Sequence, residues 1–299
     1  MPEVPDLTDR LIHIADLHFW HVARNPLVLL NKRMLGNFNV WLRRRHEFAM
    51  HRAEAYADHV ASLGIEELLL TGDFSSTALD AEFLLARAFV DGLRNRGLHI
   101  SLMAGNHDVY TFEAVRKRRF ERHFAEYLPA SGYPWLQRLK GGTPLVLIPT
   151  VCPNLVSSRG RITRAEIEQV ENLLKPLEGS VIVAGHYPLL TQTYGYTVSR
   201  ERELRNAETL RQALGRSGKP ILYVCGHVHR FSYVQDVRYP NLRHLSSGAF
   251  FRIDKTRSIN GDFSEIHVDG ESLSVFRHTY RDAWKRTAVP IRSSDDPIE

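Results

Sequence analysis

The sequence predicts an α/β fold in which two β-sheets form a layered sandwich flanked by helices. Short runs rich in Ile, Leu and Val alternate with longer segments whose apolar residues recur at three- and four-residue steps, as in strands alternating with amphipathic helices. After residue 230 the runs alternate between apolar and polar positions, which is typical of antiparallel strands. No linker-like stretch separates the two parts, so we assign residues 8–282 to one domain.

The predicted elements follow from these patterns in chain order. Buried strands are expected at residues 10–15, 66–71, 99–104, 144–149, 180–185 and 220–225. Helices are expected at residues 51–63, 80–96, 112–127, 163–175 and 206–215, and "TRAE" from Thr163 to Glu166 is typical of a capping box. Beyond residue 230, "DGES" at 269–272 predicts a hairpin turn, and residues 287–299 are expected to form a loose tail.

The composition narrows the class of protein. Hydrophobic residues make up 43% of the 299 residues, which is ordinary for a globular core, and the net charge of +5 suits an anionic substrate without demanding nucleic acid. Cys152 and Cys225 lie far apart in apolar runs, so neither a disulfide framework nor a CxxC zinc site is expected. No apolar run is long enough for a transmembrane segment, and "MPEVPDLTDR" does not resemble a secretory signal, so we expect a cytoplasmic protein.

Five of the six predicted buried strands end in side chains that bind metals or transfer protons. These endings are Asp16-Leu17-His18, Gly72-Asp73, Gly105-Asn106-His107-Asp108, Gly185-His186 and Gly226-His227-Val228-His229. Because the carboxyl ends of neighbouring strands in an α/β sheet meet in one crevice, we expect these side chains to converge there. The three polar residues that follow the third strand would then form one wall of a shared site.

Each of these residues has an ordinary explanation when it is taken alone. Asp16 or Asp73 could cap a helix, His186 could be a loop histidine, and the glycines could simply form turns. The joint occurrence favours a site, because capping would not select His over Ser at four strand ends. Carboxylate, amide and imidazole groups without a thiolate suit divalent Mn, Fe or Zn. Seven ligands exceed the needs of one ion, so we expect two ions roughly 3.5 to 4 Å apart, with Asp73 as the bridge.

The ordered motifs D-x-H, G-D, G-N-H-D, G-H and G-H-x-H, spanning residues 16 to 229, resemble those of the calcineurin-like metallophosphoesterase superfamily, in its bacterial, phosphodiesterase-type form. The resemblance implies a four-layer αββα sandwich of two mixed β-sheets. It implies two divalent ions, Mn²⁺ in the first place and Fe/Zn or Mg as alternatives. One ion would be held by Asp16, His18, Asp73 and His229, and the other by Asp73, Asn106, His186 and His227. Asn106 and His107 would contact the substrate phosphate, with Asp108 orienting His107.

The expected reaction is hydrolysis of a phosphodiester or pyrophosphate bond. Two ions would make hydroxide available from a bridging water, and a protonated His107 would donate to the leaving oxygen, help worth about 10²- to 10⁴-fold in rate. The alternatives are a UDP-diacylglucosamine pyrophosphatase-like lipid A enzyme, a cyclic-nucleotide phosphodiesterase, a nuclease, and a non-catalytic scaffold of the same fold. Tyr187 stands where many phosphodiesterase relatives have a second His, which disfavours the cyclic-nucleotide alternative.

Residues 19–46 form a predicted basic, amphipathic insertion directly after His18. No acidic residue occurs from Leu17 through His46, and five apolar residues fall on one helical stripe: Leu27, Leu30, Met34, Phe38 and Trp41. One interpretation is a helix packed over the core. The other is a flap beside the metals that contacts a membrane surface or a lipid-like phosphate ester, and it is the support for the lipid A alternative. The expected partner is therefore a small-molecule or lipid-like phosphoester, with nucleic acid not favoured.

Overall fold

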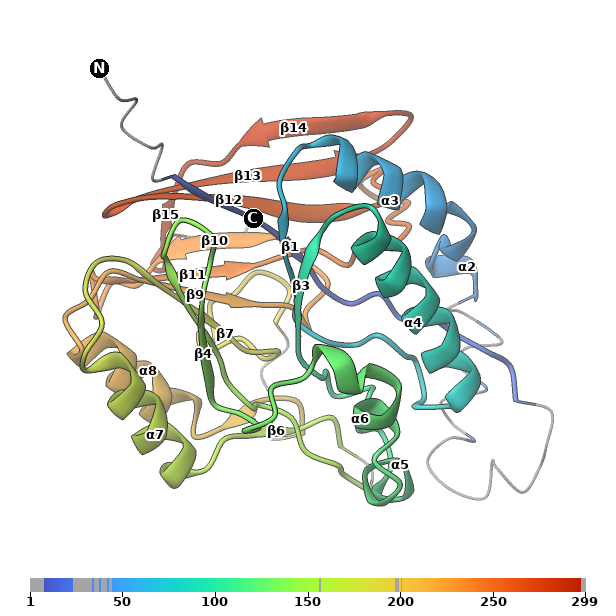
Figure 1. Cartoon of the computed structure of the whole chain (residues 1–299), viewed down its shortest axis with the longest axis horizontal. Helices are drawn as coiled ribbons and strands as arrows, with labels where there is room; N and C mark the ends of the chain where they lie inside the picture. The colour runs from blue at the N-terminus through green and yellow to red at the C-terminus, as the bar shows by residue number, and fades with distance from the viewer. Residues whose placement is uncertain are drawn as a thin grey trace.

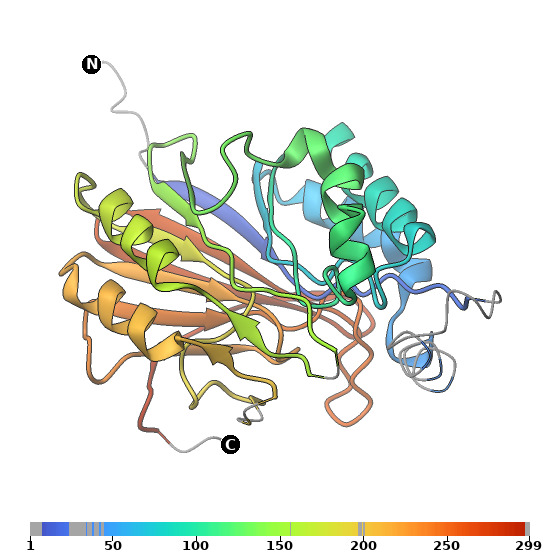
Figure 2. The same ribbon diagram turned by 90° about the horizontal axis from the view of Figure 1, so that it is seen from below.

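The computed structural model describes residues 8–23, 34, 38, 42, 45–155, 157–196, 199 and 201–296. Two large β-sheets face each other, and helices cover the outer side of each sheet (Figure 1). The view from below shows the same layers (Figure 2). The predicted α/β sandwich is confirmed. Among the described residues, none of the helices combines the length and the apolar character needed to cross a bilayer.

The six-stranded sheet carries the N-terminal strands at one side and the C-terminal strands at the other. Its order is β14-β13-β12-β1-β2-β3. The strands are β1 (Asp9–Ile14), β2 (Glu67–Leu70), β3 (His99–Leu102), β12 (Asp262–Asp269), β13 (Ser272–Tyr280) and β14 (Trp284–Ala288). Because β1, β2 and β3 are parallel, their carboxyl ends lie at one edge, where the first three predicted motifs follow them. The predicted turn at 269–272 joins β12 to β13.

The seven-stranded sheet has the order β15-β10-β11-β9-β7-β5-β4. Its strands are β4 (Trp135–Arg138), β5 (Pro144–Leu147), β7 (Val181–Ala184), β9 (Ile221–Cys225), β10 (Ser232–Gln235), β11 (Leu242–Ser246) and β15 (Arg292–Ser293). The central strands β5, β7, β9 and β11 run parallel and are buried almost throughout, as their continuous apolar sequences predict. A separate pair, β6 (Gly160–Arg161) and β8 (Leu204–Arg205), lies in the connections.

Two groups of helices cover the two sheets. The six-stranded sheet is covered by α3 (Ala53–Ser62), α4 (Asp80–Asn95), α5 (Phe112–Arg116) and α6 (Arg119–Phe124), and the seven-stranded sheet by α7 (Arg164–Leu174) and α8 (Ala207–Arg216) (Figure 1). Short helical turns are α2 (Arg45–Glu47), η3 (Met50–Arg52) and η4 (Ala125–Tyr127). The capping box predicted for α7 is present, since Thr163 Oγ1 accepts from the Glu166 backbone N–H and Glu166 Oε2 accepts from that of Thr163.

The buried apolar side chains form three clusters, one for each space between the layers. Ile12 and Ile14 point from β1 toward the helices of the six-stranded sheet, whereas Leu11 points into the space between the sheets. Val146 and Val170 belong to the third cluster, between the seven-stranded sheet and α7 and α8. Three apolar interfaces require four layers, so the arrangement is αββα.

Two predictions differ from the structure. The helix expected at 112–127 is interrupted by Arg118, whose left-handed φ of 49° separates α5 from α6. This break lets the Arg119 side chain turn inward, where it donates to the Ala78 carbonyl oxygen and pairs with Glu113. The tail expected at 287–299 is not loose in its described part. Its first two residues, 287 and 288, belong to β14, and further along the tail β15 pairs with β10.

Candidate dinuclear metal centre

The loops that carry the predicted motifs extend the hydrogen bonding of the parallel strands beyond the ends of β1 and β2. The Asp16 N–H donates to the Gly72 carbonyl oxygen at 3.1 Å, and the His18 N–H donates to the Asp73 carbonyl oxygen at 2.8 Å. Gly105 lies so close to the next loop that a Cβ there would be 2.1 Å from the Asp73 backbone nitrogen. A glycine is therefore required at 105 for the loops after β2 and β3 to touch.

One group of ligand atoms gathers around the ends of β1, β2 and β9. Asp16, His18, Asp73 and His229 each offer one such atom, and these four atoms lie within 4.8 Å of one another. The Nε2 atoms of His18 and His229 are 2.8 Å apart, and Asp73 Oδ2 is 3.5 Å from His18 Nε2. Two imidazoles and two carboxylates in this arrangement fit one divalent cation.

A second group meets at Asn106, opposite the first group across Asp73. His186 Nε2 and His227 Nδ1 each lie 2.9 Å from Asn106 Oδ1. The other carboxylate oxygen, Asp73 Oδ1, is 3.5 Å from His186 Nε2. The two oxygens of one carboxylate thus face histidines of different groups, as a bridging ligand would.

The protonation of His186 supports a cation in this second group. Its Nδ1 lies 2.8 Å from the Thr71 carbonyl oxygen, which can only accept, so Nδ1 carries the proton. Burial lowers the pKa of His186 to about 4 and that of His227 well below its usual value, so both rings are neutral at pH 7. The Nε2 lone pair of His186 therefore faces the acceptor oxygens of Asn106 and Asp73, and a metal ion would satisfy all three.

His107 lies beside the first group, with its ring centroid 4.9 Å from that of His18. Its backbone N–H donates to Asp73 Oδ1 at 2.8 Å, and its ring stacks on Tyr110. Nδ1 of His107 is 2.7 Å from the Ser76 carbonyl oxygen, which fixes the ring and leaves Nε2 as its second polar atom.

Asp108 does not take the place expected from the sequence. Its carboxylate accepts hydrogen bonds from the backbone N–H groups of Gly105, Phe74 and Ser75, while the carbonyl of Ser76 holds His107. Burial and the charge of Asp73 raise the pKa of Asp108, and the three N–H donors oppose that shift. Asp108 thus fastens the loops after β2 and β3 to each other, and one of these loops carries His107.

Unusual backbone angles are concentrated at the predicted ligands. Within the part of the chain that the structure describes, nine residues other than glycine have a positive φ. Five of the nine are predicted ligands, namely Asp16, His18, Asp73, His227 and His229. Left-handed backbone is costly for such residues and gathers at functional sites, where the surrounding structure enforces it.

Several residues that support the ligands were not identified from the sequence. Phe48 packs edge-on against His18, with ring centroids 4.9 Å apart. Thr150 Oγ1 accepts from the His186 backbone N–H, and Arg252 donates to the His229 carbonyl oxygen. Tyr187 packs against His227. Of these residues, only Tyr187 could have been singled out from the sequence, because it directly follows the predicted ligand His186.

Most of the predicted insertion at 19–46 lies outside the described residues. Among its described members, the apolar side chains of Met34, Phe38 and Leu42 are 60%, 61% and 48% exposed. Neither interpretation of the insertion is decided by these three positions.

The profile of the calcineurin-like phosphoesterases matches residues 9–231, about three quarters of the chain and every predicted ligand. The chain belongs to the calcineurin-like phosphoesterase family. Members of this family depend on dinuclear metal centres, and the donor groups described above fit such a centre. No curated protein sequence matches this phosphoesterase.

Two solved structures share the fold. A dimetal phosphatase from Danio rerio superimposes with a TM-score of 0.62 at 10% identity, covering 94% of this chain and 98% of its own. A purple acid phosphatase from yellow lupin (Lupinus luteus) seeds gives a TM-score of 0.59 at 10% identity, covering 94% of this chain and 53% of its own. The phosphoesterase chain thus spans about half of the lupin enzyme. At such identities the likeness concerns the fold.

Proposed function

We propose that the protein hydrolyses a phosphodiester or pyrophosphate bond with two divalent ions, Mn²⁺ being the first choice. The observation that carries this proposal is the placement of Asp73, whose two carboxylate oxygens face the histidines of two ligand groups. Membership of the phosphoesterase family supports the reaction class. The choice of diester or pyrophosphate over monoester is part of the proposal.

When bound, the ions supply Lewis acidity toward the phosphoryl oxygens and toward the attacking water. The residues of the chain then have distinct tasks. Asp73 keeps the two ligand groups at a fixed separation. His107 holds one proton at Nδ1 against the Ser76 carbonyl, so in the protonated, imidazolium form the second proton is at Nε2, the atom that donates to the leaving oxygen. The hydrogen bonds that the Asp108 carboxylate accepts hold the loops of Asp73 and His107 in a fixed relative position.

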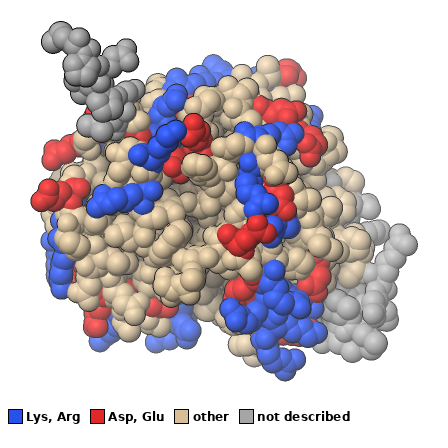
Figure 3. Space-filling model, in the orientation of Figure 1, with Lys and Arg blue, Asp and Glu red and all other residues tan. Residues whose placement is uncertain are grey.

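Positive charge at the end of α5 favours anionic substrates. Arg116, Lys117 and Arg118 are exposed at the end of α5, which follows the loop of His107. In Figure 3 basic atoms gather over α5 at the lower edge of the molecule, whereas both signs are mixed elsewhere on this face. We propose a small-molecule or lipid-like phosphoester as substrate and the cytoplasm as the location of the protein. If the substrate is linked to a lipid, residues 19–46 would also contact the membrane.

The test is metal-dependent release of p-nitrophenol from bis-p-nitrophenyl phosphate, with Mn, Fe, Zn or Mg added to metal-free protein. Asp73→Asn should lose both bound metal and activity. His107→Ala should retain metal content but lose about 10²- to 10⁴-fold in turnover. Asp58→Asn, a matched change on the exposed face of α3, should behave like the unaltered protein.

Two results would contradict the proposal. One is the absence of hydrolysis with every metal, and the other is full activity of Asp73→Asn. A scaffold of the same fold would instead bind a partner protein equally well with and without Asp73→Asn.

A further inference from the structure

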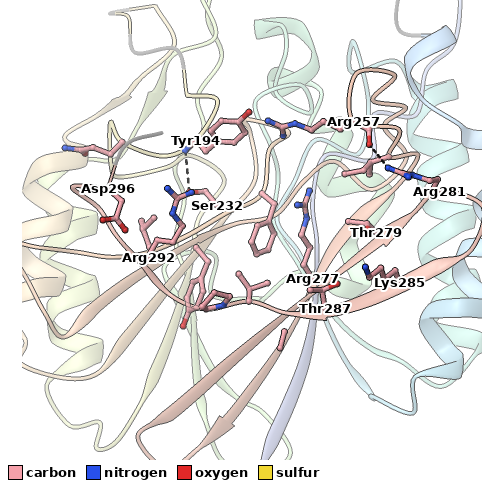
Figure 4. A pocket seen from close by; sticks show the side chains of 18 of the residues that line it. Tyr194, Ser232, Arg257, Arg277, Thr279, Arg281, Lys285, Thr287, Arg292 and Asp296 are labelled. Atoms are coloured by element: carbon pink, nitrogen blue, oxygen red, sulfur yellow. Dashed lines mark hydrogen bonds between the residues drawn. The ribbon is translucent and has the colours of Figure 1, made fainter. Parts of the chain in front are cut away.

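A large cavity lies between the two sheets, and none of the predicted metal ligands lines it. It has a volume of about 990 Å³ and lies between β13 and β14 of one sheet and β10 and β15 of the other. Figure 4 shows its lining residues, with Arg277 and Arg292 coming from opposite sheets. In a β-sandwich this space is normally filled by apolar side chains from both sheets.

The strand pattern changes from apolar to polar where the cavity begins. Along β13, Leu273 and Val275 belong to the apolar cluster between the sheets. The next residues on the same face are Arg277 and Thr279, because side chains alternate along a strand. The register pairs Arg277 with Thr287 and Thr279 with Lys285, so β14 presents polar side chains to the same space. Lys285 and Thr287 are exposed, so this polar end of the sandwich is open to solvent, which indicates a binding cavity rather than incomplete packing.

The lining has an excess of positive charge. Five basic residues line the cavity, namely Arg257, Arg277, Arg281, Lys285 and Arg292, against two acidic ones, Asp282 and Asp296, which leaves an excess of three. Arg277 is paired with buried Asp262, but Lys285 forms no ion pair with any described residue. The charge favours an anionic ligand.

Apolar and aromatic surface accompanies this charge. Phe231, Ile259 and Val289 also line the cavity. The guanidinium of Arg277 lies 4.8 Å from the ring centroid of Phe231, and that of Arg257 lies 4.6 Å from the ring of Tyr194. A ligand that matches both kinds of surface carries an anionic group together with an apolar or aromatic portion.

The cavity lies next to the metal centre. A narrow crevice lined by the predicted ligand His229 shares Arg257, Ile259 and Arg277 with it. The topology agrees, because β12 is antiparallel to both β1 and β13, so β13 runs parallel to β1 and ends at the edge where Asp16 lies. One elongated molecule could therefore reach from the ligand groups into the cavity.

We propose that this cavity binds a second anionic group, with its attached apolar or aromatic portion, of the substrate whose ester bond lies at the metal centre. This inference rests on the proposed function, which it deepens by requiring a substrate with two separate anionic parts. The basic lining would bind the remote anion, and the aromatic rings would contact the portion that joins it to the reacting ester.

The first experiment measures binding without metal, so it does not depend on catalysis. Chelator-treated protein is titrated calorimetrically with ADP and, below its micelle concentration, with dodecyl phosphate. Binding of either probe supports the proposal and tells a nucleotide-like from a lipid-like ligand. Thr287→Asp places a carboxylate beside Arg277 and should weaken binding about tenfold or more, whereas Thr287→Ser should bind as before.

A second pair of variants covers the case in which Thr287→Asp does not fold. Lys285→Gln, on an exposed strand, should also weaken binding severalfold, while Lys175→Gln at the end of α7 should not. The proposal is overturned if neither probe binds, or if both Thr287→Asp and Lys285→Gln bind as well as the unaltered protein.

The kinetic experiment ties the cavity to the substrate. The ratio of kcat/KM for the p-nitrophenyl ester of a nucleoside diphosphate to that for bis-p-nitrophenyl phosphate should fall about tenfold in Thr287→Asp relative to Thr287→Ser. An unchanged ratio would overturn the link to the substrate. If neither ester is hydrolysed by any variant, the proposed function fails, and the metal-free titration still reports on the cavity.

Discussion

Tyr187 packs ring against ring on His227, with centroids 4.1 Å apart and planes inclined by 36°. Its hydroxyl donates to the Ser158 carbonyl oxygen, and its own carbonyl oxygen accepts from the Tyr223 hydroxyl, so the ring is held from both ends. A fully buried aromatic ring therefore sets the orientation of one predicted ligand.

Tyr187→Ala should weaken metal binding in the second ligand group by about 10- to 100-fold, because His227 loses the surface that orients it. Tyr187→Phe keeps the ring and should bind metal nearly as well as the unaltered protein. Competition with a chelator, followed by metal analysis, measures both variants. Equal affinities for Tyr187→Ala and Tyr187→Phe would rule out a role for the ring.

Gly105→Ala should prevent the loops after β2 and β3 from meeting. The added methyl would lie 2.1 Å from the Asp73 backbone nitrogen, and backbone atoms cannot move aside as a flexible side chain does. We expect a lower melting temperature and loss of bound metal. Gly92→Ala is the matched control, since it lies inside α4 with only an Arg96 side chain nearby and should stabilise by about 0.5 to 1 kcal/mol. A Gly105→Ala protein with full metal content would contradict this account.

His13 should make the stability of the metal-free protein depend on pH. Burial lowers its pKa to about 3, while its ring nitrogens contact Thr71 Oγ1 and Ser247 Oγ at 2.8 and 2.6 Å. Between pH 6.5 and 3 the unfolded state binds a proton that the folded state excludes. The free energy of unfolding should therefore fall as the pH is lowered through this window, by about 1.4 kcal/mol per unit from this residue.

His13→Gln removes the titrating group. Urea unfolding in the presence of a chelator at pH 7, 6 and 5 should show a shallower slope for the variant than for the unaltered protein. Parallel slopes would mean that His13 is not the group responsible.

Asp236, which follows β10 of the seven-stranded sheet, should contribute strongly to the stability of the protein. Its carboxylate is buried and binds Arg211 through two hydrogen bonds of 2.7 Å, and His244 through one of 3.0 Å. Burial alone would raise the pKa of Asp236, but Arg211 and His244 hold it below the usual range. Asp236→Asn should cost about 3 kcal/mol in the free energy of unfolding.

The matched control for Asp236→Asn is Glu208→Gln, which removes a half-exposed partner of the same arginine. Its cost should stay below about 1 kcal/mol, because exposed pairs are screened by water. Chemical denaturation measures both variants. If both variants lowered the free energy of unfolding by similar amounts, the buried pair of Asp236 and Arg211 would not be the dominant one.

The sequence was sufficient for the layers and for the convergence of the motifs. Buried strands such as Val181–Ala184 are continuous apolar runs, and their carboxyl ends must share an edge once the strands are parallel. The same reasoning placed Asp16 and His229 together across more than two hundred residues. In these cases the residue types at the strand ends were enough to predict the site, because parallel strands bring those ends to one edge of the sheet.

The supporting contacts could not be predicted, because they depend on packing between distant segments. The family resemblance implied that Asp108 orients His107, but its carboxylate accepts hydrogen bonds from backbone N–H groups of another loop. Phe48 contacts His18 from a segment without any motif. The polar inner face of β13 and β14 is visible as alternation in the sequence, but only the register shows which residues face inward.

The left-handed backbone at five predicted ligands sets the stability of the chain against the identity of the side chain at each of them. At such positions glycine is the residue that relaxes the chain, so His227→Gly would ease the local strain while removing a ligand. Replacing such a residue by glycine would therefore exchange a predicted metal ligand for a more relaxed backbone, so stability and ligand identity oppose each other at these five positions.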